Sequence, residues 1–367
     1  MLLPYSMPWK RIYMYIENPD RTNLRYGYTT GACATAATKA ALLMLVTGKI
    51  VKNVEINLPI KKTASFIIEN QRIEKDFCIA SVKKDGGDDP DVTTGLDIYS
   101  RVELKKEPGI IVAGGEGIGT VTKQGLPVQP GNPAINPVPL KMIRSAVGEI
   151  IEAYGIPGGV KVTVSAPGGR EVAKNTCNPK LGIIGGISIL GTRGIVIPFS
   201  DSSWKASIVL GIRVASRMGM DVLIFSTGGR SDSAVKKLFP DLHDEQFIEI
   251  GDFLGFSLKR AVDAGIKKVI VAGMPGKMSK LADNNMDLHS SKSGVNFNFL
   301  ASVASSCGYD SSIVDKIRNS NTVLEVMGII GYGDKFIEEI KKKCVENMNN
   351  YIGGKIIISV EIIKNTY

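Results

Sequence analysis

The pattern of apolar and polar positions divides the chain into two parts near residue 193. In the first part, short runs of apolar and β-branched residues are separated by polar breaks, which is typical of antiparallel strands. These runs are 54–60, 64–70, 76–82 and 96–104. Two stretches have the helical period instead, an alanine-rich one over 31–46 and an apolar stripe over 141–154. The first part therefore predicts an α+β domain with a mostly antiparallel sheet.

Prolines and glycines predict the connections of this part. The proline-rich segment 124–139 favours an extended, rigid loop, because proline fixes φ and lacks an amide hydrogen. The alternating run 160–166 is followed by Pro167-Gly168-Gly169, which predicts a hairpin. We expect residues 1–24 to form an extension of the domain.

Beyond residue 193, continuous apolar strands alternate with helical stretches. The predicted strands are 194–200, 221–227, 246–250, 267–273 and 355–363. We expect Asp201 to cap the first helix. This alternation is typical of a parallel sheet with helices on both faces. The sequence therefore predicts two domains, an α+β domain over 1–192 and a Rossmann-like, doubly wound α/β domain over 193–367.

Composition restricts the class of protein. Hydrophobic content of 44% is that of a globular protein, and no apolar run reaches the roughly 18–20 residues of a membrane helix. Pro4, Pro8 and Lys10 interrupt the N-terminus, so we expect no signal peptide and a cytoplasmic protein. The net charge of +9 comes without a nucleic-acid-binding signature. It fits a small polycarboxylate or phosphorylated substrate, and we expect neither nucleic acid nor a membrane as partner.

Cysteine and histidine are too sparse for a metal centre. The five cysteines are widely spaced without a Cys-x-x-Cys pair, which favours reduced thiols over disulfides or a zinc site. The two histidines are His243 and His289. We therefore expect no metal ion bound by the protein itself.

The segment YTTGACATAATKAA predicts a capped helix start. Thr29 or Thr30 can cap the helix, and the small residues from Gly31 leave the first-turn amides open to an anion. The alternative is an ordinary capped helix with small residues for tight packing.

The loop DGGDDPDVTTG holds Asp85, Asp88, Asp89 and Asp91 within seven residues. Such a cluster could hold a cation, accept a proton or bind substrate, although aspartates in loops are also common turn formers. The spacing is not that of an EF-hand.

Two glycine-containing turns of the second part follow predicted strands. Ligands of open α/β sheets bind outside the carboxyl ends of the strands, which makes these turns candidate cofactor contacts. The residues are Ser226, Thr227, Gly228 and Gly229 in the first turn and Gly273, Gly276 and Lys277 in the second. His289 lies in a hydroxyl-rich loop and is a candidate proton acceptor.

Seven segments occur in a recognisable order. They are 25–34, 86–93, 125–143, 178–196, 226–232, 251–261 and 273–282. Together they resemble the CbiD family, the cobalt-precorrin-5B C1-methyltransferases of anaerobic cobalamin (vitamin B12) biosynthesis. The resemblance spans roughly residues 24 to 305.

The resemblance implies a methyl transfer from S-adenosylmethionine to carbon C1 of cobalt-precorrin-5B, a contracted tetrapyrrole, to give cobalt-precorrin-6A. The cobalt would travel with this substrate. On this interpretation, Asp89 and His289 are catalytic candidates, and the strand-end turns hold the cofactor, with the tetrapyrrole in the cleft between the domains. The candidate substrate-binding residues are Thr29, Thr30, Gly31, Asp88, Asp91 and Asn136.

The sequence departs from the family pattern at six positions, and it leaves two other functions open. The departures are Leu140, Arg193, Ile197, Leu288, Gly294 and Asn298. A small-molecule kinase could hold phosphates at the helix start from Thr29 to Gly31, but a lysine-bearing phosphate loop is missing. A non-enzymatic tetrapyrrole carrier would bind corrinoid without S-adenosylmethionine. A homo-oligomer and transient contacts with other pathway enzymes are also left open.

Overall fold

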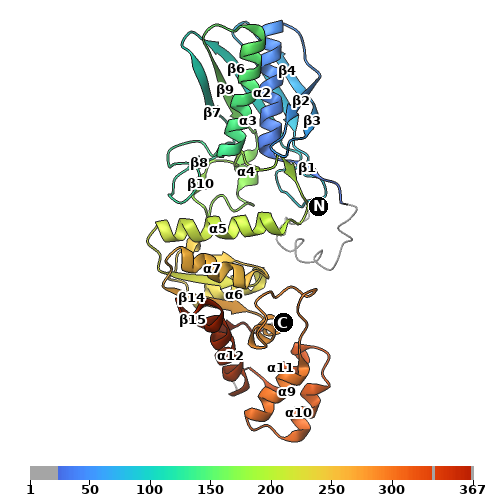
Figure 1. Ribbon diagram of the computed structural model, residues 1–367, viewed down its shortest axis with the longest axis vertical. Coiled ribbons are helices and arrows are strands. Elements are labelled where there is room, and N and C mark those ends of the chain that lie inside the picture. The colour runs from blue at the N-terminus through green and yellow to red at the C-terminus, as the bar shows by residue number, and fades with distance from the viewer. Residues whose placement is uncertain (1–23, 333–334, 365–367) are drawn as a thin grey trace, which may run out of the picture. The chain divides into compact units, whose positions relative to one another are not determined.

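The structure is a computed structural model that describes residues 24–332 and 335–364. The chain has a mixed α/β fold with several sheets and divides into two compact units, Met1–Ser200 and Asp201–Tyr367 (Figure 1). The sequence pattern predicted the boundary between the two domains at residues 192 and 193. Each unit has a hydrophobic core made of its own residues.

The first unit is built on a five-stranded sheet in the order β4-β5-β6-β9-β7. The strands are β4 (Glu69–Ile73), β5 (Phe77–Lys83), β6 (Asp97–Lys105), β7 (Gly109–Gly114) and β9 (Gly159–Ser165). Strand β7 runs parallel to β9, and the other neighbours are antiparallel. The predicted mostly antiparallel sheet is confirmed, with β4 and β7 as strands that the sequence pattern did not identify as such.

Helix α2 (Thr30–Thr47) is the core of this unit. It packs against β5, β6 and helix α3 (Pro137–Tyr154), and its alanines are fully buried. We expected no segment apolar enough to cross a membrane, but α2 is long and apolar enough by length and composition. Of its 18 residues, 72% are buried inside the unit. Burial on all sides explains why alanine dominates: small side chains allow the helix and its neighbours to approach closely.

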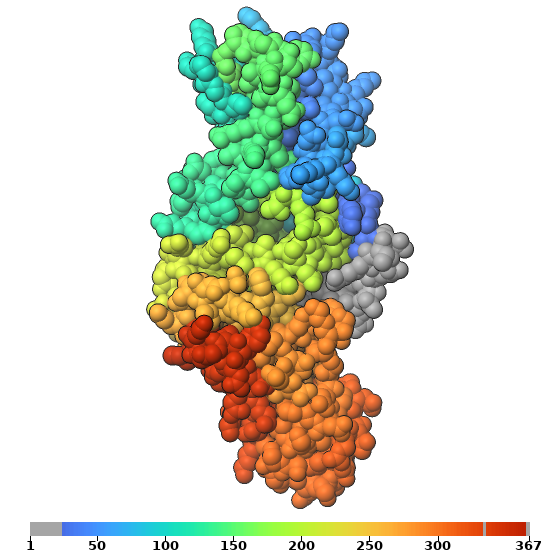
Figure 2. Space-filling model, in the orientation of Figure 1, coloured from blue at the N-terminus to red at the C-terminus, as the bar shows by residue number. Residues whose placement is uncertain are grey.

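Short strands complete the first unit. They are β1 (Gly27–Tyr28) paired with β11 (Ile195–Val196), β2 (Asn53–Asn57) with β3 (Thr63–Ile67), and β8 (Thr120–Val121) with β10 (Ile183–Ile184). A groove of about 370 Å³ lies between α3 and the β2–β3 hairpin. Residues of these elements lie side by side on the face shown in Figure 2.

Three expectations for this unit are wrong. The predicted strand 194–200 contributes only β11, which pairs with β1 and does not join the second sheet. Residues 167–169 do not form the predicted hairpin. Strand β9 is followed by helix α4 (Gly169–Ala173), because both edges of β9 are already paired, with β6 and with β7. Helix α3 begins at Pro137, inside the proline-rich segment, since proline is well suited to the first helical position.

The second unit contains a four-stranded parallel sheet in the order β13-β12-β14-β15. The strands are β12 (Val222–Ser226), β13 (Phe247–Glu249), β14 (Lys268–Gly273) and β15 (Ile357–Ile362). The helices are α5 (Asp201–Arg217), α6 (Gly229–Leu238), α7 (Leu254–Asp263), α8 (Pro275–Ala282), α9 (Phe297–Ser306), α10 (Ser311–Arg318), α11 (Val323–Ile330) and α12 (Lys335–Ile352), with the short helix η2 (Asp244–Gln246) before β13. Because the strands are parallel, their carboxyl ends lie along one edge of the sheet.

Both faces of this sheet are covered. Leu223 and Phe225 of β12 belong to the larger cluster, together with residues of α5, α7 and α12. The intervening Ile224 packs on the other face, with Val235 of α6. The alternation along β12 therefore buries every side chain of its centre, which explains the continuous apolar run in the sequence.

The close approach of β1 to the aspartate-rich loop gives the first testable prediction. A Cβ atom at Gly27 would lie 2.1 Å from the carbonyl carbon of Gly86, and backbone atoms cannot move away cheaply. We expect Gly27→Ala to lower the free energy of unfolding by about 1–3 kcal/mol, as overpacking does. Denaturant unfolding measures this change. The control is Gly148→Ala in α3, where nothing lies within 4 Å and alanine should stabilise the helix by roughly 0.5–1 kcal/mol. Equal stability of Gly27→Ala and the wild type would contradict the close approach.

Candidate functional site

The start of α2 is closed by the chain itself. Thr29 is the N-cap, and its Oγ1 accepts a hydrogen bond from the amide of Ala32 at 3.2 Å. The Gly31 amide donates to the carbonyl oxygen of Leu190 at 3.0 Å, and the Cys33 amide donates to the carbonyl oxygen of Thr29. The expectation of free first-turn amides is therefore not met, and the kinase alternative loses the donors that would have held a phosphate.

The segment 188–190 also holds Thr30 and Asn136. Thr30 is 4% exposed, accepts a hydrogen bond from the Leu190 amide at 2.9 Å, and lies 3.1 Å from the carbonyl oxygen of Ser188. Asn136 precedes α3 and donates its amide to Ile189. Its side chain makes no hydrogen bond with any described residue and is half-buried. Of the candidate substrate-binding residues Thr29, Thr30 and Asn136, Asn136 is the one whose side chain has no hydrogen bond among the described residues.

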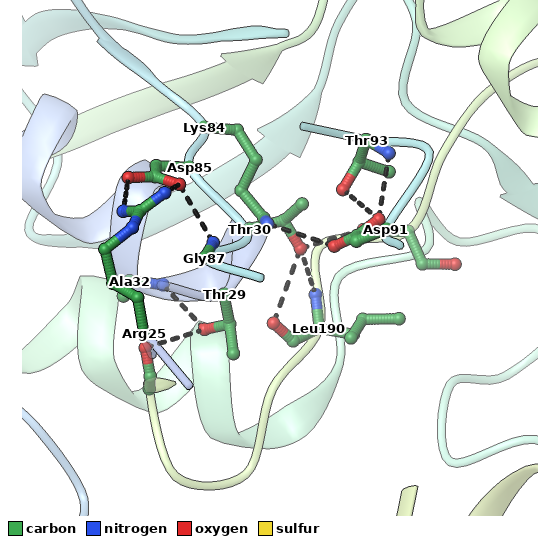
Figure 3. Close-up of polar contacts among 12 residues, drawn as sticks. Arg25, Thr29, Thr30, Ala32, Lys84, Asp85, Gly87, Asp91, Thr93 and Leu190 are labelled. Carbon is green, nitrogen blue, oxygen red and sulfur yellow. Dashed lines mark hydrogen bonds and ion pairs between the residues drawn. The ribbon is translucent and has the colours of Figure 1, made fainter. Parts of the chain in front are cut away.

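The aspartate-rich loop is mostly held by its own neighbours (Figure 3). Asp85 pairs with the Arg25 guanidinium, which lowers the pKa of this carboxyl, and accepts the Gly87 amide at 2.8 Å. Asp88 is exposed and accepts the backbone amide of Arg25 at 2.6 Å. These two aspartates connect the loop, through contacts with Arg25, to the segment that precedes β1.

Asp91 is paired with Lys84, a residue that the motif analysis missed. The Lys84 Nζ lies 3.0 Å from Asp91 Oδ2, and the lysine side chain is only 1% exposed. Burial alone would raise the pKa of Asp91, but the lysine charge and two hydrogen bonds from Thr93 outweigh it and lower this pKa. The sequence did carry a signal for the burial of Lys84, because side chains alternate between the two faces of a strand. Lys84 continues the buried face of β5, on which Cys78 and Ala80 also lie.

Asp89 differs from the other three aspartates. One of its carboxyl oxygens accepts the Phe199 amide at 2.9 Å, and among the described residues no cation pairs with it. Burial raises the pKa of Asp89. Phe199 has φ of 54°, in the left-handed region, so the backbone that presents this amide is strained. Asp89 is therefore the member of the loop whose carboxyl is best suited to exchange a proton.

In the second unit, Lys277 of α8 joins three strand ends. Its Nζ donates to the carbonyl oxygen of Thr227, after β12, and lies 3.0 Å from Asp252 Oδ1, after β13. Lys277 itself follows β14. The contact with Asp252 lacks hydrogen-bond geometry and is chiefly ionic. The lysine charge is thus already matched within the protein, which leaves less of it for an anionic ligand than the sequence suggested.

Most predicted cofactor contacts at this edge have structural partners. Ser226 is fully buried and lies 2.9 Å from Asp232, and Thr227 is 2% exposed. A Cβ atom at Gly273 would lie 2.4 Å from the Met278 Cε atom and 2.9 Å from the Thr227 Oγ1 atom, so a larger residue there would displace these side chains. At Gly276, by contrast, nothing lies within 4 Å. A Cβ atom at Gly276 would therefore meet open space, whereas the side chains of Ser226 and Thr227 are buried.

Glu249, the last residue of β13, was not singled out from the sequence. Its half-buried carboxyl has neither a hydrogen bond nor an ion pair in the part of the chain that the structure describes. Burial raises the pKa of Glu249 to about 7, against the opposing charge of Lys277. The available signal was an acidic residue at the end of an otherwise apolar strand.

His289 lies in a loop tied to the same edge. Its Nδ1 is 2.7 Å from the Ser291 hydroxyl. The Leu288 amide donates to the carbonyl oxygen of Asp252 at 3.2 Å, which holds this loop beside the turn after β13. The two catalytic candidates thus belong to different units, Asp89 to the first and His289 to the second. Among residues 24–332 and 335–364, no group of three or more potential ligands could hold a metal ion.

The raised pKa of Glu249 predicts a dependence of stability on pH. The folded pKa of about 7 exceeds the ordinary value of 4.5, so the native state binds the proton more tightly than the unfolded state. This carboxyl therefore destabilises the fold progressively as pH rises from 4.5 to 7. We expect Glu249→Gln to raise the free energy of unfolding by roughly 1–3 kcal/mol at pH 8 and to change it little at pH 4.5. Thermal melts at the two pH values test this, with Glu361→Gln of β15 as control. A melting temperature of Glu249→Gln at pH 8 that is equal to or below that of the wild type would contradict the burial of this carboxyl.

Comparison with known proteins identifies the family. A family model described as CbiD matches residues 17–198, and one described as the CbiD C-terminal domain matches residues 287–366. A cobalt-precorrin-5B C(1)-methyltransferase from Picrophilus torridus is 55% identical over 82% of this chain and 86% of that protein. One of the same name from Geobacillus kaustophilus is 47% identical over 93% and 92%. A crystal structure of the cobalamin biosynthesis protein CbiD from Archaeoglobus fulgidus is 30% identical, with a TM-score of 0.39 over 69% of this chain and 78% of that one. The chain therefore belongs to the CbiD family.

Proposed function

We propose that this protein is a cobalt-precorrin-5B C1-methyltransferase, which transfers a methyl group from S-adenosylmethionine to a tetrapyrrole. The observation that carries the proposal is the similarity to relatives of that name along almost the whole chain, at 55% and 47% identity. Cobalt enters as part of the substrate. The protein needs no metal ion of its own for this reaction, because the sulfonium already activates the methyl group.

The second unit is the proposed cofactor domain. Its parallel sheet, with helices on both faces, supports a Rossmann-like assignment. In such sheets, ligands lie outside the carboxyl ends of the central strands. Here that edge carries the open space at Gly276 and the unpaired carboxyl of Glu249. We therefore place S-adenosylmethionine over the ends of β12, β13 and β14.

The first unit is proposed to contribute to tetrapyrrole binding and proton transfer. The exposed Asp88 and the side chain of Asn136 can form hydrogen bonds with amide, hydroxyl or N–H groups of the substrate. Asp89 is the proposed proton acceptor, since its burial moves the pKa toward neutrality, where a general base is most effective.

For the methyl transfer itself, the enzyme mainly has to position the two reactants. The substrate carbon attacks the methyl group in line, the carbon–sulfur bond breaks, and the positive charge on sulfur disappears. Holding two reactants in this geometry can supply about 7–11 kcal/mol of the barrier. A proton leaves the ring as the macrocycle rearranges, and Asp89 or His289 would accept it.

The reaction is tested with S-adenosylmethionine that carries a labelled methyl group. The purified protein and anaerobically prepared cobalt-precorrin-5B should yield labelled cobalt-precorrin-6A and S-adenosylhomocysteine in equal amounts. Tight corrinoid binding without methyl transfer or S-adenosylhomocysteine binding would instead favour the carrier. Turnover of ATP would favour the kinase.

The proton-accepting role of Asp89 is tested by Asp89→Asn. Asparagine keeps an oxygen for the Phe199 amide but is not a base, so we expect turnover to fall roughly 10²–10⁴-fold with the melting temperature unchanged or raised. The matched control in the same loop is Asp91→Asn, which leaves the buried Lys84 without its counter-charge and should instead lower stability. Normal single-turnover methyl transfer by Asp89→Asn would exclude Asp89 as the base.

A further inference from the structure

Glu249 and the first glycine-containing turn are brought together by the register of the sheet. Strands β12 and β13 are parallel neighbours, and Glu249 pairs with Ser226, the last residue of β12. Residues on paired positions of parallel strands point to the same face. The carboxyl of Glu249 therefore stands at the level where β12 ends and the turn Thr227–Gly229 begins.

The carboxyl is unusual because it is half-buried without a partner. Two other acidic residues near this edge have partners. Asp252 pairs with Lys277, and Asp232 contacts Ser226 and Lys236. The carboxyl of Glu249 has no hydrogen bond or ion pair among the described residues, and its pKa is raised to about 7. A buried polar group without a partner is costly, and such groups cluster where ligands bind.

The chemistry of this carboxyl selects its ligand. A carboxylate has two acceptor oxygens and no donor, so it matches a pair of adjacent hydroxyl groups and repels phosphate. An acidic side chain about 20 residues after a glycine-containing strand-end turn is also the arrangement that binds a ribose hydroxyl in nucleotide-binding α/β folds. S-Adenosylmethionine carries a ribose diol and no phosphate.

From this juxtaposition we infer that Glu249 binds the ribose 2′- and 3′-hydroxyl groups of S-adenosylmethionine at the carboxyl end of β13. The inference rests on the proposed function. It adds a specificity-determining residue in the second unit, because the site binds nucleosides with an intact ribose more tightly than nucleosides that lack these hydroxyls. Proton loss from Glu249 accompanies binding near neutral pH, because the hydroxyl donors stabilise the carboxylate.

The test compares two ligands and two proteins. Calorimetry measures the affinity of S-adenosylhomocysteine and of its 2′,3′-dideoxyribose analogue for the full-length wild type and for Glu249→Gln, with and without a corrinoid. Hydrogen bonds to a charged group are strong. We therefore expect wild type to bind the dideoxy analogue about 10- to 100-fold more weakly than S-adenosylhomocysteine. Glu249→Gln should lose a similar factor for S-adenosylhomocysteine and discriminate little between the two ligands.

Controls separate the inference from folding and from the proposed function. Glu361→Gln changes an acidic residue near the same end of β15, where Glu361 pairs with Ala272 of β14, and should keep wild-type affinity and discrimination. Thermal melts confirm that both variants are folded. Wild-type discrimination retained by Glu249→Gln overturns this inference alone. Failure of the wild type to bind S-adenosylhomocysteine under either condition overturns the proposed function and the inference with it.

Discussion

The ammonium group of Lys277 determines which charges remain available at the carboxyl edge of the parallel sheet. It joins the carbonyl of Thr227 to the carboxyl of Asp252, so one lysine fixes the ends of β12 and β13 from the start of α8. Parallel strands leave their last carbonyl groups at one edge, and Lys277 donates to the carbonyl oxygen that follows β12. Because Asp252 takes the lysine, Glu249 remains without a counter-ion, and its burial then raises its pKa.

The first unit shows the same arrangement with different residues. The buried Lys84 pairs with Asp91, and the nearby Asp89 is left with a single backbone donor and a raised pKa. A buried ion pair contributes little net stability when compared with apolar packing, since desolvation offsets its attraction. In each unit the paired acid holds the loop in place while the unpaired acid keeps its capacity to bind or to accept a proton.

The elements with strong periodicity could be predicted from the sequence, and tertiary partners decided the others. Strands β12, β13 and β14 were predicted because buried parallel strands are apolar on both faces. The run 194–200 has the same apolar character, but β1 was its partner, and no local pattern reveals a partner some 170 residues away in sequence. The same limit applies to the candidate sites. Gly31 was correctly placed at a helix start, yet only the fold shows that Leu190 occupies its amide. Glu249 was missed because a single acid at a strand end has no motif of its own until the neighbouring strand is known.

The all-round burial of α2 has a consequence for the order in which the chain is made. Its alanine-rich surface is covered by β5, β6 and α3, and α3 ends only at Tyr154, far downstream of Thr47. At about 5–20 residues per second, a ribosome completes α3 on the order of ten seconds after α2. During that interval the nascent chain presents an apolar segment long enough to be taken for a membrane anchor. Synthesis, more than the finished fold, is therefore the stage at which the apolar surface of this helix is least covered.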